Sequence, residues 1–154
     1  MASYRHLARK CVMQALFAAE FNKIDVTETL EELLDEFAPK LTERDFAFDT
    51  LNGVIENRDV ILALISKFAP HWPIEKIAKI DKAILEIAIY ELEYSNAIPG
   101  AVAINEAVEI AKEFGDDNSS KFINGVLSSV MEYSEKDESK EDRISNTEED
   151  EEKN

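Results

Sequence analysis

Residues 98–127 read IPGAVAINEAVEIAKEFGDDNSSKFINGVL and decide the fold, because they predict two consecutive helices joined by a polar turn. The first helix is expected from Pro99 to Phe114 and is stopped by Gly115, which permits a left-handed turn. Its apolar face consists of Ala103, Ile104, Ala107, Val108, Ala111 and Phe114. No carboxylates or lysines in this stretch have catalytic spacing, so the pattern indicates a packed interaction module rather than an active site.

The second helix of this stretch is expected from Ser119 to Tyr133, with Asn118 or Ser119 as its N-cap. Gly125 is unfavourable inside a helix and therefore predicts a close backbone contact. Four side chains of the stretch have no structural explanation in this pattern: Asn105, Lys121, Phe122 and Asn124. They are the functional candidates of the segment.

The rest of the sequence predicts a single all-helical domain of about seven helices over residues 1–133. Hydrophobic residues make up 45% of the 154 residues, and only four glycines and four prolines interrupt the chain. The most apolar helix is expected over residues 74–94, and so broad an apolar set indicates the centre of a bundle. The remaining helices are expected at residues 4–21, 27–37, 43–56 and 58–69. Residues 134–154 contain ten acidic residues and one large apolar residue, so they predict a disordered acidic tail.

Composition and motif content exclude several protein classes. A single cysteine, Cys11, cannot form an intramolecular disulfide and suits a reducing cytosol. No apolar run approaches the ~18 residues of a membrane helix, and the N-terminus lacks a signal-peptide core, so a cytoplasmic protein without membrane contact is expected. The sequence has no Gly-rich phosphate loop, H-E-x-x-H or C-x-x-C motif, so we expect neither an enzyme nor a cofactor or metal site.

The first helix has a cationic end, although the formal net charge of the chain is −16. Residues 1–19 contain no acid, and at about 100° per residue the basic side chains share one stripe: Arg5, His6, Arg9 and Lys10. Met13 and Phe17 fall inside this stripe. RNA binding uses such faces, because cations neutralise phosphates and exposed rings stack on bases. The stripe also fits an ordinary solvated face with Phe17 packed between helices, while Cys11 lies on the apolar side and is expected in the core.

Other polar groups have structural interpretations. His71 and Trp72 lie in a proline-flanked loop, where the pair of rings is expected to cap a helix end. Glu106 and Glu109 are expected on the exposed face of their helix, where carboxylates are usually solvated. None of these four residues is a candidate for chemistry.

Four motifs of this chain resemble the NusB family of transcription antitermination factors. They are ARKCVMQALF at residues 8–17, IAKIDKAILEIAIYEL at residues 77–92, IPGAVAINEAVEIAKEFG at residues 98–115 and SSKFINGVL at residues 119–127. The resemblance covers residues 3–133, and the order of the motifs is highly specific. It implies an all-helical fold of two small bundles that share a long central helix, and a non-enzymatic role.

The resemblance also implies partners. NusB-like factors pair with NusE, a small-subunit ribosomal protein, and hold the boxA sequence of nascent rRNA leaders in a complex that keeps RNA polymerase from terminating early. The RNA contacts of such proteins map onto Arg5, His6, Arg9, Lys10, Lys121 and Phe122. The partner-protein contacts map onto Phe17, Glu75, Asp81 and Asn118. A homodimer is a further option for the same chain.

Two departures from the family pattern bear on these contacts. Family members often have three consecutive arginines before the Ala-Arg pair, where this chain has Tyr4-Arg5-His6-Leu7. This difference implies weak RNA binding by the isolated protein and a greater dependence on the partner. Asn118 stands where an acidic side chain is common, which weakens the partner contact expected at that position.

Two other function classes remain open from the sequence. The same fold serves as the RNA-guiding domain of rRNA cytosine methyltransferases, where a Gly-rich cofactor loop and a catalytic cysteine are expected after the helical module. Neither feature follows the module in this chain. The third class is a purely protein-binding helical adaptor, and RNA binding with and without NusE would separate it from the first.

Overall fold

The computed structural model describes residues 2–136, and over this range the fold is entirely helical. Its elements are α1 (Ala2–Phe21), α2 (Val26–Phe37), α3 (Asp45–Glu56), α4 (Arg58–Phe68), the 3-10 turn η1 (Ile74–Lys76), α5 (Lys79–Tyr94), α6 (Gly100–Phe114) and α7 (Asp117–Lys136). The predicted all-α fold class of about seven helices is confirmed. None of the helices in this range combines the length and apolar character needed to cross a bilayer.

Local sequence signals explain several helix boundaries. Asp25 caps α2, because its side chain accepts hydrogen bonds from the backbone amides of Thr27 and Glu28 at 3.0 and 3.1 Å. Pro39 follows directly after α2 and its C-cap, where a residue that precedes proline leaves the helical region. Pro99, with φ −58° and ψ 141°, is the residue from which α6 begins.

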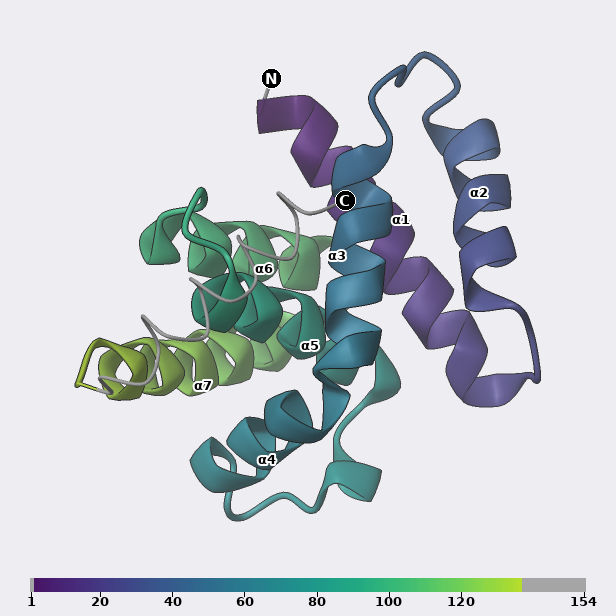
Figure 1. The fold of residues 1–154 in the computed structure, drawn as a ribbon. Helices are drawn as coiled ribbons and strands as arrows, with labels where there is room; N and C mark the ends of the chain where they lie inside the picture. Colours follow the sequence, from purple (N-terminus) through teal and green to yellow (C-terminus); the bar gives the residue numbers. More distant parts are fainter. Residues whose placement is uncertain (1, 137–154) are drawn as a thin grey trace.

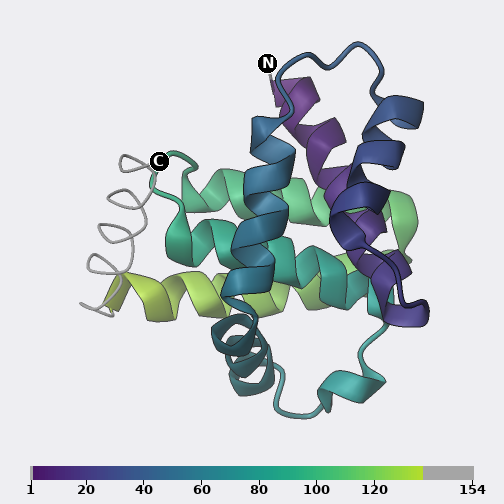
Figure 2. The ribbon, with the colours of Figure 1, turned by 45° about the vertical axis from the view of Figure 1, so that its right-hand side comes forward.

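The helices form two groups that cross each other (Figures 1 and 2). The first group consists of α1, α2 and α3, and the second of α5, α6 and α7, which stack transversely to it, while α4 lies beyond the end of α3. One helix, α5, joins both groups, since it packs against α1, α3, α4, α6 and α7. It corresponds to the shared central helix that the resemblance implies.

The central position of α5 is evident from its burial. Every residue from Asp81 to Tyr94 is buried except Tyr90, which is partly buried. Gly53 of α3 makes room for the Tyr90 ring, because a Cβ at residue 53 would collide with it. The burial of α5 also takes charged groups such as Glu91 into the interior, where they require partners.

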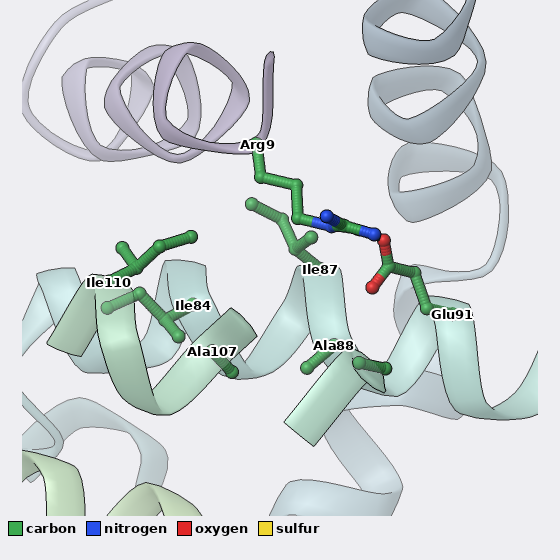
Figure 3. A pocket seen from close by; sticks show the side chains of 8 residues that line it. Arg9, Ile84, Ile87, Ala88, Glu91, Ala107 and Ile110 are labelled. Atoms are coloured by element: carbon green, nitrogen blue, oxygen red, sulfur yellow. The ribbon is translucent and has the colours of Figure 1, made fainter. Parts of the chain in front are cut away.

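Glu91 finds its partner in Arg9 of α1 (Figure 3). Arg9 Nε donates a hydrogen bond of 2.7 Å to Glu91 Oε1, and the two side chains are only 4% and 1% exposed. Arg9 Nη1 also lies 3.4 Å from Oε2 of Glu106 on α6. Burial raises the pKa of Glu91 and Arg9 lowers it, so the guanidinium is what favours the ionised carboxylate. The remaining cavity of about 10 Å³ beside the pair has an apolar lining and accommodates no more than one water.

A second set of ion pairs holds the last turn of α1 to α4 and α5. Lys82 Nζ donates to Glu20 Oε1 at 2.5 Å, and this hydrogen bond lowers the pKa of Glu20. Arg58 Nη2 lies 3.2 Å from Oε2 of the buried Glu86. Charge pairs therefore fix α1 against the central helix both in its first half and at its C-terminal end.

The continuous helix predicted over residues 74–94 is wrong. Ile77 and Ala78 are extended, with ψ angles of 133° and 135°, and they separate η1 from α5. The side chain of Ile77 is 5% exposed and belongs to the hydrophobic core. The apolar spacing of this segment suits an unbroken helix equally well, so the interruption follows from tertiary packing rather than from a local signal.

Two further predictions are wrong, the left-handed turn at Gly115 and the close contact at Gly125, although Gly115 ends α6 as predicted. Gly115 is extended, with φ −113° and ψ −155°, and its missing side chain matters because a Cβ there would lie 2.7 Å from Ser119 Oγ. Gly125 has no neighbouring atom within 4 Å of its Cβ position, so no close contact explains it. Close approach occurs instead at Gly100, where a Cβ would lie 2.8 Å from Met131 Sδ.

The two ends of α7 differ from the prediction as well. Asp116, rather than Asn118 or Ser119, caps this helix by accepting a 2.8 Å hydrogen bond from the Ser119 backbone amide. The helix continues to Lys136, beyond the end predicted at Tyr133, and Ser134 is buried. The rest of the predicted disordered tail, residues 137–154, lies outside the described residues.

We expect Glu91→Gln to lower the free energy of unfolding by about 3 kcal/mol, because it leaves the buried Arg9 without its main counter-charge. Glu106 still faces the guanidinium, which keeps the loss at the lower end of the range for broken buried pairs. Urea denaturation followed by circular dichroism measures the change. The control is Glu109→Gln on the exposed face of α6, which should alter stability by less than about 0.5 kcal/mol. Equal effects of the two substitutions would contradict a structural role of the Arg9–Glu91 pair.

Candidate functional site

The basic edge, defined as residues 5–10 of α1, is the first of two surfaces that gather predicted site residues. Its side chains reach α6: His6 Nδ1 lies 2.6 Å from Glu106 Oε2, and Lys10 Nζ lies 3.1 Å from Glu113 Oε1. Carboxylates of α5 and α6 therefore meet three of the four basic residues of this edge. Much of its positive charge is already paired within the protein.

The predicted exposed stripe on α1 is wrong at two positions. Arg9 is 4% exposed and Met13 is fully buried, although the helical wheel places both on the cationic side. The wheel orders positions around one helix, but it cannot show that carboxylates of α5 and α6 approach Arg9. Phe17, in the same stripe, is partly buried. Cys11 lies in the core as predicted, and burial raises the pKa of its thiol.

Glu106 also differs from the sequence interpretation. Its side chain is 20% exposed and lies against His6 and Arg9 instead of being solvated. Glu109 is 54% exposed as predicted, with Lys112 at 3.4 Å. The acidic residues of α6 therefore divide into those that neutralise the basic edge and those that face solvent.

Arg5 differs from the other residues of the basic edge because it is exposed and has no salt bridge among residues 2–136. Its Cζ atom lies 4.9 Å from the centroid of the Phe46 ring on α3. Lys121, in the first half of α7, is likewise exposed without a salt bridge in that range. Arg5 and Lys121 are therefore the predicted RNA contacts whose charge is most available to a phosphate.

The second surface is a groove of about 290 Å³ between the start of α5 and the start of α7. The loop after α4 and the η1 turn complete its walls, and the extended residues Ile77 and Ala78 form part of them. Its polar and aromatic lining includes Trp72, Lys76, Asp81, Asn118, Ser119 and Phe122. The interruption before α5 is thus a feature of this groove.

Two carboxylates line the groove and both are held by Ser119. Ser119 Oγ donates to Asp81 Oδ2 at 3.2 Å, and the backbone amide of the same residue donates to Asp116 Oδ1. Burial raises the pKa of Asp81, the Ser119 hydrogen bond lowers it, and the nearby Asp116 charge raises it again. A buried carboxylate of this kind favours a cationic group supplied by a ligand, and perturbed groups in a cleft are typical of functional sites.

Three predicted site residues meet in this groove: Asp81, Asn118 and Phe122. Glu75 is exposed on η1, directly before Lys76, which lines the groove. Phe17 does not line it. The groove therefore contains two of the four predicted partner contacts, Asp81 and Asn118, and one of the predicted RNA contacts, Phe122.

Sequence reasoning does not identify Trp72, whose interpretation as a helix cap is wrong. The indole is 54% exposed and lines the groove, and the neighbouring His71 is exposed as well. A large aromatic residue in a loop is a signal that the sequence contains. Its exposure depends on how the loop packs, which the sequence does not show.

The α6–α7 turn connects the two surfaces. Lys10 meets Glu113 in the last turn of α6, and Asp116 and Ser119 of the groove follow within a few residues. The residue of α6 that meets the basic edge and the residues of the turn that line the groove are therefore only a few positions apart in the chain. This arrangement can bind two ligands of opposite charge next to each other.

Comparison with known proteins shows similarity to the NusB family, whose model matches residues 6–132. The chain is 43% identical over 127 residues to the transcription antitermination protein NusB of Bacillus subtilis (strain 168), which covers 82% of this chain and 93% of that protein. It is 40% identical over 130 residues to the protein of the same name from Dehalococcoides mccartyi, with coverages of 84% and 91%. The similarity thus extends over nearly the full length of these relatives.

Solved structures show the same relationship. The structure of T. maritima NusB has a TM-score of 0.74 at 36% sequence identity and covers 83% of this chain and 90% of that one. A structure of the antitermination factors NusB and NusE in complex with dsRNA has a TM-score of 0.76 at 20% identity, covering 86% of this chain and 99% of the matched chain. At that identity the second comparison shows a shared fold.

We expect Asp81→Asn to become more stable relative to the wild type as the pH rises. A raised pKa means that the folded protein binds the Asp81 proton more tightly than the unfolded chain does. The stabilisation by this bound proton is fully present below the ordinary pKa of 3.8 and is lost as the pH rises through the raised value. Asp81→Asn has no proton to lose at this position, so the wild type loses stability relative to the variant over that window. Urea denaturation of both proteins from acidic to neutral pH measures the difference. Asp117→Asn controls for the loss of an exposed carboxylate, and parallel profiles of Asp81→Asn and the wild type would contradict the prediction.

Proposed function

Since this chain belongs to the NusB family of transcription antitermination proteins, we propose that it holds boxA-type RNA of nascent rRNA leaders together with the ribosomal protein NusE and helps RNA polymerase to resist premature termination. The junction of the basic edge with the acidic groove at the α6–α7 turn is the observation that carries this proposal. Adjoining surfaces of opposite charge suit an adaptor between RNA and a basic protein. The action is non-enzymatic and takes place in the cytoplasm.

The RNA side of the proposal uses the basic edge and α7. Its contacts are Arg5, His6, Lys10, Lys121 and Phe122. Lys10 is paired with Glu113, whose side chain is 48% exposed, so a phosphate can replace this partner. Arg9 contributes indirectly, because its donors are used inside the protein to hold α1 in place.

The partner side of the proposal uses the groove. An exposed Trp72 beside Asp81 and Asp116 fits a basic and partly apolar segment of NusE, since an indole attracts cations and carboxylates pair with them. Asn118 lines the groove without a charge, and the two aspartates outnumber the one lysine of the lining, Lys76, so the formal charge of the groove is negative. Two further contacts flank it in the proposal: Glu75 and Phe17.

The relatives favour this function over the role of an RNA-guiding domain in an rRNA cytosine methyltransferase. They are named transcription antitermination proteins, and the matches cover 93% and 91% of their length. A purely protein-binding adaptor differs from the proposed function in its response to RNA. Filter binding of boxA RNA with and without NusE distinguishes these two functions.

We expect the double substitution of Arg5→Gln and Lys121→Gln to weaken binding of a boxA oligonucleotide by the complex with NusE. Each lost phosphate contact should reduce the salt slope by about 0.7 for single-stranded RNA, because fewer counterions are released. Electrophoretic shifts over a series of salt concentrations measure both quantities. Lys23→Gln, at an exposed lysine between α1 and α2, controls for the loss of one positive charge elsewhere on the surface. Unchanged affinity and slope in the double variant would rule out the proposed RNA surface.

Trp72→Ala should weaken NusE binding in the absence of RNA by about 2 kcal/mol, roughly thirtyfold, if the indole anchors the partner. The reason is the loss of the largest exposed aromatic surface of the groove. Titration calorimetry with purified NusE measures the affinity. Phe37→Ala at the end of α2 is a matched control, because that ring is 52% exposed but lies outside the groove. Wild-type affinity of Trp72→Ala would remove the groove from the proposal.

A further inference from the structure

Phe46, in the first turn of α3, meets two guanidinium groups of α1. The Cζ atom of Arg5 lies 4.9 Å from the ring centroid, and that of Arg9 lies 5.1 Å from it. Both distances fall within the ~6 Å over which an aromatic face attracts a cation. The ring is partly buried and also packs against the core, so its own position is fixed.

The two arginines use their hydrogen-bond donors differently. Those of Arg9 face Glu91 and Glu106, at 2.7 and 3.4 Å. Arg5 is exposed and has no salt bridge within the described part of the chain. A guanidinium contacts an aromatic ring through its flat face, so the N–H donors in its plane remain available to an oxyanion.

We propose that Phe46 is a positioning residue for RNA binding, which holds the Arg5 guanidinium over its ring so that a backbone phosphate of single-stranded RNA meets an ordered cation. This inference rests on the proposed function and deepens it. It adds α3 to an RNA surface that the sequence assigns to α1 and α7 alone. Neither the helical wheel nor the family motifs point to Phe46.

An aromatic ring suits this task better than a carboxylate does. The long Arg5 side chain loses rotamer freedom when it binds a phosphate, and a ring that orders it beforehand reduces this loss. A carboxylate would also order the side chain, but it would occupy the donors and neutralise the charge, as Glu113 does for Lys10. The Phe46 ring orders the cation and leaves its charge free.

The charges around the ring favour this arrangement. Two guanidinium groups beside one ring would repel each other, but Glu91 and Glu106 neutralise Arg9. Burial raises the pKa of Glu91, while the attraction of Arg9 and, to a smaller extent, of Arg5 lowers it. Arg5 therefore lies within electrostatic reach of Glu91, although it forms no ion pair with that carboxylate.

A double-mutant cycle in the full chain bound to NusE tests the proposal, with fluorescence anisotropy of a boxA oligonucleotide over a salt series. Phe46→Leu keeps an apolar side chain but removes the ring, and it should weaken binding about two- to fivefold. The salt slope should stay unchanged in Phe46→Leu, because Arg5 keeps its charge, and should fall by about 0.7 in Arg5→Gln. The double variant should bind no more weakly than Arg5→Gln alone, because Phe46 acts through Arg5.

Phe46→Tyr retains the ring and should bind RNA like the wild type. If Phe46 had a purely structural role, the loss of affinity in Phe46→Leu would not depend on whether Arg5 is present. Circular dichroism melting reports on folding, and Phe46→Met is a second ring-free variant with a side chain that adapts to irregular packing. Additive losses in the double variant, or wild-type affinity of folded Phe46→Leu and Phe46→Met, would overturn the role of Phe46. An Arg5→Gln variant with wild-type affinity and slope would overturn this role together with the proposed RNA surface.

Discussion

The buried ion pair between Arg9 and Glu91 is the constraint on which the rest of this structure depends. Both side chains are almost completely removed from water, and each buried charge costs several kcal/mol in lost hydration. The 2.7 Å hydrogen bond to Glu91 and the nearby carboxylate of Glu106 offset this cost only when α1, α5 and α6 keep one relative arrangement. A shift of α1 would leave an unpaired charge in the interior. The pair therefore determines where α1 lies more than it adds to stability.

The position of α1 in turn determines how a mostly acidic chain presents a cationic surface. With Arg9 inside, the side chains of the basic edge reach α6, whose carboxylates Glu106 and Glu113 neutralise most of its charge. Arg5 remains accessible because a ring, rather than an acid, lies beside it. A surface whose cations are mostly paired attracts polyanions weakly by charge alone, so binding depends on a ligand that replaces the acids and on a partner that holds it nearby.

Helical periodicity predicts the number of helices and most of their bounds, because every helix of this domain buries a stripe that recurs each three to four residues. It cannot predict the interruption at Ile77, where the same side chains would also form a continuous stripe. The α1 wheel is wrong at Arg9 because the solvation of that position depends on carboxylates distant in the sequence. The site is equally non-local: the family resemblance selects Asp81 and Asn118, but only the fold places them with Trp72 in one groove.

The α6–α7 turn explains how two surfaces of opposite charge adjoin without interfering. Gly115 leaves no room for a side chain beside Ser119, and that closeness keeps the turn tight. Ser119 then binds both carboxylates of the groove, while Glu113, just before the turn, pairs with Lys10 of the basic edge. The last turn of α6 therefore contacts the basic edge, and the first turn of α7 lines the groove. The groove therefore presents carboxylates beside Trp72, whereas the basic edge presents cations that are mostly paired, so a ligand is selected by the groups it meets as well as by its charge.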